Sequence, residues 1–172
     1  MTNKGANKIP MDAALDYLTA KTRTVREMEL YLDAKQYGEY EVYQAVERLK
    51  ELNYLNDEKY AEDFIASRLA TKPVSRKKLS EQLYMHQLPK DVIEGALAAV
   101  SDETEEENAR RMVSKYWRQF ETLPEDERRQ RVIKRLVARG YSFDMIRTAA
   151  KQVMGVVDAS ELDVECECTD DD

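Results

Sequence analysis

Residues 75–100, SRKKLSEQLYMHQLPKDVIEGALAAV, decide the fold of this chain because the same pattern of apolar side chains occurs twice more. The stretch 24–49, TVREMELYLDAKQYGEYEVYQAVERL, carries the pattern 51 residues earlier, and 127–153 carries it 53 residues later. Such fixed-period self-similarity is typical of a stack of identical supersecondary units. Six apolar positions keep these offsets: Met28, Leu32, Val42, Ala45, Val46 and Leu49 correspond to Leu79, Leu83, Ile93, Ala96, Leu97 and Val100, and then to Val132, Leu136, Ile146, Ala149, Ala150 and Val153.

The spacing inside each copy predicts helices. Apolar residues recur at three and four, strand signals are absent, and only four Pro and five Gly interrupt the chain. Thr24 and Ser75 stand where N-cap hydroxyls are expected, and Gly38, Gln87 and Gly140 fall between or beside the second and third helices, where Gly allows a left-handed backbone. We therefore predict an all-α protein of three tandem three-helix modules that form an elongated, curved, right- or left-handed helical repeat.

The module boundaries follow from the repeat. We expect a flexible N-terminus at 1–10 and three-helix repeats at 11–56, 57–101 and 102–154. Residues 155–172 hold eight Asp and Glu without any Lys or Arg, which predicts an acidic, disordered tail. This tail could compete with DNA phosphates for basic surface.

The charge is distributed unevenly along the chain. The formal net charge is −7, which taken alone would argue against a nucleic-acid partner. Residues 109–154, however, carry twelve Lys and Arg against five Asp and Glu. The average therefore hides a basic third module and an acidic tail.

The sequence shows no catalytic constellation. Its single histidine, His86, is expected to be a partly exposed residue at a helix end, and no Gly-rich phosphate loop or Ser or Cys nucleophile motif occurs. Both cysteines, Cys166 and Cys168, lie in the tail without the further ligands that a zinc site needs. We expect no enzyme activity, no metal or other cofactor, no small-molecule substrate and no membrane association. The N-terminal residues lack the apolar stretch of a signal peptide, so a cytoplasmic location is expected.

Basic residues follow the predicted second helices. Arg128, Arg131, Arg135 and Arg139 are spaced by three and four, which predicts a continuous guanidinium ridge with Lys134 alongside. In the middle module, basic residues gather at the start of the second helix: Lys72, Arg76, Lys77 and Lys78. Such faces bind an anionic partner, such as a DNA backbone or an acidic protein groove, or they are solvated faces with surface ion pairs. Basic charge alone does not separate these alternatives.

Three stretches of the sequence form a recognisable set: LKELNYLNDEKYAEDFIASR at 49–68, SRKKLSEQL at 75–83 and KRLVARGYSFDMI at 134–146. In order and spacing they resemble the RecX family of recombination regulators. The resemblance covers about residues 12–153. It implies a curved, all-helical protein that binds the RecA recombinase in the groove of its filament on DNA and lowers its ATP hydrolysis, strand exchange and co-protease action.

The leading hypothesis is therefore a regulatory protein that binds RecA or its filament, with only weak direct binding to DNA. The alternatives are a stand-alone helical DNA-binding module and a generic helical adaptor protein. The DNA-binding alternative is disfavoured because the third helices carry acidic side chains that would repel phosphate, namely Glu41, Glu47, Asp91 and Glu94. The residues predicted to contact RecA or DNA, chosen for their charge and position on exposed faces, are Arg68, Arg76, Lys77, Arg131, Lys134, Arg135 and Arg139.

Overall fold

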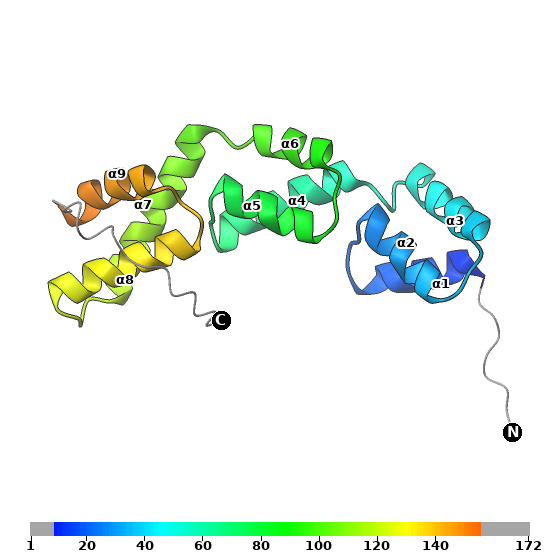
Figure 1. Cartoon of the computed structure of the whole chain (residues 1–172), viewed down its shortest axis with the longest axis horizontal. Helices are drawn as coiled ribbons and strands as arrows, with labels where there is room; N and C mark the ends of the chain where they lie inside the picture. The colour runs from blue at the N-terminus through cyan, green and yellow to red at the C-terminus, as the bar shows by residue number, and fades with distance from the viewer. Residues whose placement is uncertain (1–8, 156–172) are drawn as a thin grey trace, which may run out of the picture. The chain divides into compact units, whose positions relative to one another are not determined.

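The structure, a computed structural model, describes residues 9–155, and their regular secondary structure is helical throughout. This confirms the predicted all-α fold. The predicted N-terminal segment, except for Ile9 and Pro10, and the predicted tail beyond Gly155 lie outside the described residues. The helices in chain order (Figure 1) are α1 Pro10–Ala20, α2 Val25–Ala34, α3 Glu39–Glu51, α4 Asp57–Thr71, α5 Arg76–Met85, α6 Lys90–Ala98, α7 Asp102–Gln119, α8 Glu125–Ala138 and α9 Phe143–Met154.

The repeated apolar positions form the core. All of them are buried except Ala96, Leu97 and Val153, which are half-buried. Met28, Leu79 and Val132, which share one position of the repeat, are each 0% exposed. The constant offset in the sequence therefore reflects one packing arrangement used three times.

Side-chain caps start several of the helices. Thr24 Oγ1 accepts the N–H of Glu27 at 3.1 Å, and Ser75 Oγ accepts the N–H of Lys78 at 3.1 Å, as the sequence predicts. Ser101 caps α7, so the acidic run 103–107 lies at the N-terminal end of that helix. Carboxylates are favoured there because unpaired N–H groups give this end a partial positive charge.

The chain reverses between second and third helices through a left-handed residue. Gln36, Gln87 and Gly140 have φ values of 65°, 59° and 82°. These positions are separated by the repeat offsets of 51 and 53. The prediction for Gly38 was wrong, because this residue has φ −65° and is the extended N-cap of α3. A glutamine, rather than the nearby glycine, takes the left-handed position in the first module.

The described residues divide into two compact units. The first comprises 9–64 and 82–96, and the second comprises 65–81 and 97–155. In the first unit, helices α1, α2 and α3 pack on one another around a shared apolar cluster. Tyr17 stacks on Tyr31 with ring centroids 3.9 Å apart, and the guanidinium of Arg23 lies 4.0 Å from the Tyr17 ring centroid. Aromatic stacking thus extends the contact between α1 and α2.

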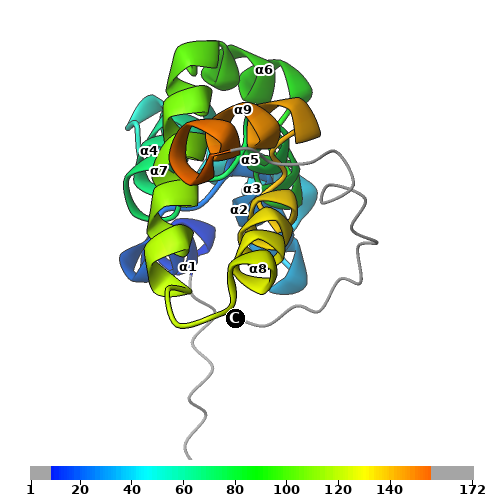
Figure 2. The same ribbon diagram turned by 90° about the vertical axis from the view of Figure 1, so that its left-hand side faces the viewer.

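In the second unit, α7, α8 and α9 enclose a second apolar cluster. Helix α9 crosses α7, and α8 lies beside them (Figure 2). Met112, Ile133 and Ile146, one from each of these helices, are at most 1% exposed. Helix α7 contacts both α8 and α9, and this packing positions the basic residues on α8.

Candidate interaction surface

Each unit contains a small set of polar contacts that joins helix ends, and the two sets use equivalent residues. In the first unit, Asp57 Oδ1 at the start of α4 accepts the N–H of Val25 at 2.9 Å. The hydroxyl of Thr24 donates to the carbonyl of His86 at 3.0 Å. We call Thr24, Val25, Asp57 and His86 the first joint. It satisfies a first-turn N–H of α2, which has no partner inside its own helix.

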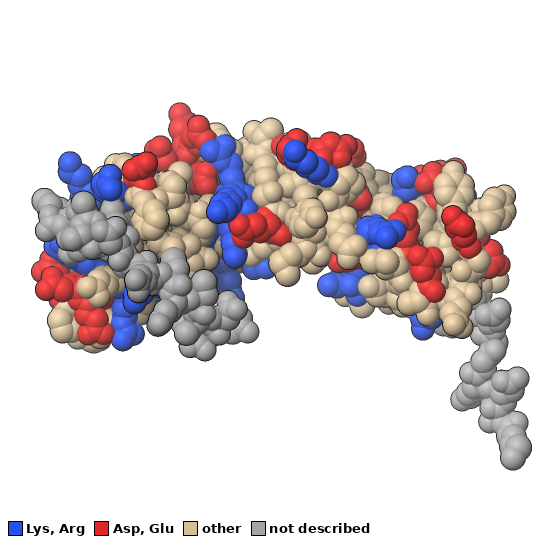
Figure 3. All heavy atoms as spheres, viewed as in Figure 1, with Lys and Arg blue, Asp and Glu red and all other residues tan. Residues whose placement is uncertain are grey.

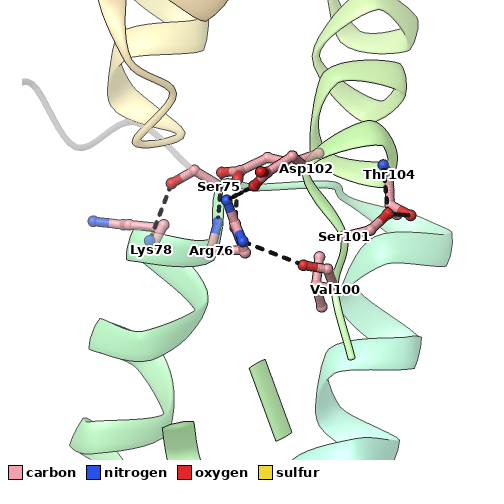
Figure 4. A network of polar contacts seen from close by, with 8 residues as sticks. Ser75, Arg76, Lys78, Val100, Ser101, Asp102 and Thr104 are labelled. Atoms are coloured by element: carbon pink, nitrogen blue, oxygen red, sulfur yellow. Dashed lines mark hydrogen bonds and ion pairs between the residues drawn. The ribbon is translucent and has the colours of Figure 1, made fainter. Parts of the chain in front are cut away.

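The second unit has a similar set of contacts, and Figure 4 shows the part of it around Ser75 and Arg76. Glu105 Oε1 on α7 accepts the N–H of Arg76 at 2.9 Å, and the N–H of Ser75 donates to the carbonyl of Arg139 at 3.0 Å. We call Ser75, Arg76, Glu105 and Arg139 the second joint. Glu105 is only 8% exposed, although the sequence places it in a run of acidic residues that looks uniformly solvated. Sequence reasoning missed this carboxylate, and only its helical register hints at its burial.

The second joint engages the Arg76 side chain. Its Nε lies 2.7 Å from Glu105 Oε2, and its guanidinium also contacts Asp102 and the carbonyl of Val100. The hydrogen bond to Glu105 raises the pKa of Arg76 above its ordinary value. Arg76 is therefore half-buried and already paired, whereas the sequence predicted it on an exposed face.

The predicted guanidinium ridge is interrupted at both ends. Arg139 Nε donates to the Tyr116 hydroxyl at 2.7 Å, and its Nη1 donates to the carbonyl of Pro73 at 3.0 Å. Arg128 lies over the Trp117 ring at 3.7 Å from its centroid and donates to the Trp117 carbonyl. Both side chains are half-buried, so the prediction of a continuous exposed ridge was wrong. An arginine beside an aromatic residue folds back onto it, which helical spacing does not reveal.

The middle of the ridge does face solvent. Arg131 is exposed and pairs with Glu127 at 3.0 Å. Lys134 and Arg135 are exposed and make no hydrogen bond or ion pair within residues 9–155. Among the other predicted contact residues, Lys77 is exposed and equally unpartnered there, and Arg68 is half-buried. In Figure 3, Lys and Arg side chains gather where the N-terminal end of α5 lies beside α7.

His86 has a structural role in the first joint. Its Nδ1 lies 2.9 Å from Glu27 Oε1, and its ring meets the rings of Tyr60 and Phe64 at centroid distances of 5.6 and 5.5 Å. The residue follows the last residue of α5 and is half-buried, which confirms the predicted position at a helix end. No group of three His, Cys, Asp or Glu in the described part of the chain could hold a metal ion.

Charge and exposed apolar surface are divided between the units. Residues 9–64 and 82–96 carry eight Lys and Arg against 15 Asp and Glu, a net charge of −7. Residues 65–81 and 97–155 carry 17 against 11, a net charge of +6. Within residues 9–155, the large exposed apolar side chains follow the same division. Only Phe143 belongs to the second unit, and the first unit holds Ile9, Leu15, Leu30, Tyr40, Tyr43, Leu52, Tyr54, Tyr84 and Met85.

These features define an all-α protein with one acidic, aromatic unit and one basic unit. No helix within residues 9–155 is long and apolar enough to cross a membrane. Three family models match the chain, described as the first, second and third three-helix domains of RecX, at residues 11–49, 56–97 and 103–149. The chain belongs to the RecX family.

Curated relatives are named regulatory protein RecX. The protein from Listeria monocytogenes serotype 4a (strain HCC23) is 24% identical over 165 residues, which are 95% of this chain and 60% of that protein. The Bacillus subtilis (strain 168) protein is 29% identical over 150 residues, which are 87% of this chain and 55% of that protein. The chain thus spans little more than half the length of these relatives. The family to which it belongs is named for regulation rather than catalysis.

Solved structures share the fold. The crystal structure of RecX from Lactobacillus salivarius superposes with a TM-score of 0.72 at 23% identity, covering 84% of this chain and 94% of that chain. A second crystal structure of a regulatory protein RecX gives a TM-score of 0.68 at 21% identity, covering 84% of this chain and 71% of that chain. These likenesses show that the all-helical fold predicted from the sequence is shared with both structures.

Proposed function

We propose that this chain binds the RecA recombinase, or its filament on DNA, and inhibits its ATPase, strand-exchange and co-protease activities, thereby modulating DNA repair and recombination. The observation that carries the proposal is the division of charge between the two units. A filament of protein on DNA offers two kinds of surface, because protein side chains and nucleic-acid phosphates are both accessible. A chain with one acidic, aromatic unit and one basic unit has a complementary surface for each.

The first unit supports a protein partner. Its net charge of −7 would repel phosphate. Tyr40 and Tyr43, on α3, are 70% and 62% exposed. Tyrosine is enriched at the energetic centres of protein interfaces because its ring is apolar and its hydroxyl bonds at the edge. This unit is therefore the better candidate for contacts with RecA itself.

The second unit supports an anionic partner. Arg131, Lys134 and Arg135 present three cationic side chains within about one turn of α8, and Lys77 adds a fourth on α5. Arg68, Arg76 and Arg139 complete the predicted contact set, but Arg76 and Arg139 are engaged in intramolecular contacts. We therefore infer that Arg76 and Arg139 stabilise the structure beneath the surface, and that the exposed residues make the direct contacts.

ATP hydrolysis by the cognate RecA on single-stranded DNA is the decisive assay. The protein is titrated in at well below one molecule per RecA. Inhibition in that range is expected if the protein acts on a filament, since one bound molecule then affects several subunits. Unchanged hydrolysis, in a sample whose far-UV circular dichroism shows folded helix, would contradict the proposal.

A double charge reversal tests the assigned surface. The Arg131→Glu/Arg135→Glu variant is expected to lose inhibition while keeping its helix content. The matched control is Lys21→Glu/Lys59→Glu, which reverses two exposed cations of the first unit and changes the net charge equally. If both variants inhibit as the unmodified protein does, the basic surface of α8 is not a contact surface.

Direct DNA binding is the second candidate function. The unpartnered Lys134 and Arg135 favour it, whereas acid on α3 and α6 opposes insertion of those helices into a groove. Binding through phosphates should weaken with salt by a log-log slope of about −0.9 for each phosphate neutralised. A steep slope with bare DNA, together with no effect on RecA, would favour this alternative.

A further inference from the structure

The second unit carries more cations than its own acids neutralise. Eight basic side chains are exposed and make no hydrogen bond or ion pair within the described residues: Lys72, Lys77, Arg110, Lys115, Arg118, Lys134, Arg135 and Lys151. Placing like charges on one small body costs free energy unless counterions or an anionic ligand gather there. The same chain contains a polyanionic segment whose charge could neutralise them.

That polyanion is the segment 156–172. It contains eight Asp and Glu and no basic residue, so its charge is −8 against the +6 of the second unit. The first unit, at −7, would repel it. Charge complementarity therefore favours the second unit as the surface that binds this segment.

The point of attachment favours the same unit. The segment follows Gly155 directly, and Met154 is 8% exposed in the apolar cluster formed with α7 and α8. Seventeen residues reach at most about 60 Å when extended, whereas the 14 residues of α8 span about 21 Å. A segment tethered so close acts at an effective concentration of the order of mM. The basic side chains of α8 therefore lie within its reach.

We propose that residues 156–172 bind the basic surface of the second unit, centred on Lys134 and Arg135, and must be displaced before that surface binds a nucleic-acid backbone. The segment then acts as an intramolecular competitor that lowers affinity for polyanions and suppresses non-specific binding. Because both the internal and the external contacts are ionic, added salt weakens both. The inhibitory effect of the segment is therefore largest at low salt.

The test compares three forms of the protein: the full chain, a chain that ends at Val157, and a full-length form in which the Asp and Glu of 158–172 are replaced by Asn and Gln. Fluorescence anisotropy with a labelled single-stranded oligothymidylate measures their affinities. The shortened and the neutralised forms are expected to bind about tenfold more tightly than the full chain at low salt, with the difference shrinking as salt rises. Equal affinity of all three forms would overturn the proposal.

A second readout separates docking from general repulsion between the segment and DNA. A zero-length carbodiimide reagent joins carboxylates to lysine amines that they contact. In the full chain, cross-links from 158–172 are expected at Lys134 and Lys77, with Lys21 and Lys59 of the first unit as matched controls. Equal cross-linking of all four lysines would mean that the segment acts by its charge alone and does not dock. Circular dichroism confirms that each form is folded.

The oligonucleotide assay contains no RecA. Although the inference uses the surface assigned under the proposed function, the two fail separately. A folded protein that does not affect RecA can still show the gain in oligonucleotide affinity on truncation. A RecA inhibitor whose truncated form binds the oligonucleotide no better would retain the proposed function and lose this inference.

Discussion

Replacing Gly140 by alanine should destabilise the second unit. Gly140 has φ +82°, a left-handed conformation that costs an L-residue about 1–2 kcal/mol. A Cβ there would lie 2.5 Å from Ser75 Oγ and 3.1 Å from the Cβ of Lys78. The Ser75 hydroxyl must then move from the N–H of Lys78, and loss of such a cap costs about 1 kcal/mol. The expected loss in the free energy of unfolding is therefore about 2–3 kcal/mol.

Urea unfolding followed by Trp117 fluorescence measures this loss, because Trp117 is the only tryptophan in the sequence and lies in the second unit. Two glycines serve as controls. Gly155→Ala, with φ +83° and no atom of the described residues within 4 Å of the new Cβ, introduces the backbone strain without the crowding. Gly95→Ala, in α6 and equally uncrowded, should stabilise its helix by about 0.5–1 kcal/mol. An unchanged or higher midpoint for Gly140→Ala would refute the reasoning.

Three further substitutions probe the joints and the ridge. Burial raises the pKa of Asp57 above its ordinary 3.8, despite the main-chain hydrogen bond that the carboxylate accepts. The carboxyl therefore stabilises the fold when it is protonated, and this contribution is lost as pH rises. The Asp57→Asn variant should melt at a higher temperature than the unmodified protein at pH 7 and at the same temperature at pH 3, as measured by circular dichroism. Glu105→Ala should lower the free energy of unfolding by about 1 kcal/mol more than Arg76→Ala in urea titrations, because only Glu105→Ala also leaves the main-chain N–H of residue 76 without its acceptor. Arg128→Lys should cost about 1 kcal/mol, seen in the fluorescence transition of Trp117, because an ammonium cannot stack on the indole while donating through a planar fork.

The fold was predictable because the core is repeated. An apolar side chain contributes to stability mainly through the surface it removes from water, so each copy of the module needs apolar residues at the same positions. Leu32, Leu83 and Leu136 occupy one such position, and each is 0% exposed. Spacing alone is sufficient to find a pattern of this kind. The N-caps Thr24 and Ser75 were predictable for a similar reason, since few residue types serve there.

The polar details were not predictable from the residue types. Gln36 adopts a left-handed backbone that glutamine does not favour, so the sequence directed attention to Gly38 instead. Glu105 lies among other acids, and only its position on α7 distinguishes the one that is buried. Arg128 looks like a surface residue by spacing, and its contact with Trp117 depends on the side-chain geometry. Such features follow from three-dimensional neighbours, which periodicity does not specify.

The two joints explain how one module can be repeated without repeating its surface. Each joint uses main-chain groups at helix ends: a carboxylate accepts a first-turn N–H, and a carbonyl that follows α5 or α8 accepts a hydrogen bond. Asp57 and Glu105 both serve as the carboxylate, and the carbonyls of His86 and Arg139 both serve as the acceptor. The side chains at the carbonyl positions differ, because His86 contacts Glu27 whereas Arg139 donates to Tyr116. The same helical module can then carry acidic and aromatic residues in the first unit and basic residues in the second, as binding to both protein and nucleic acid would require.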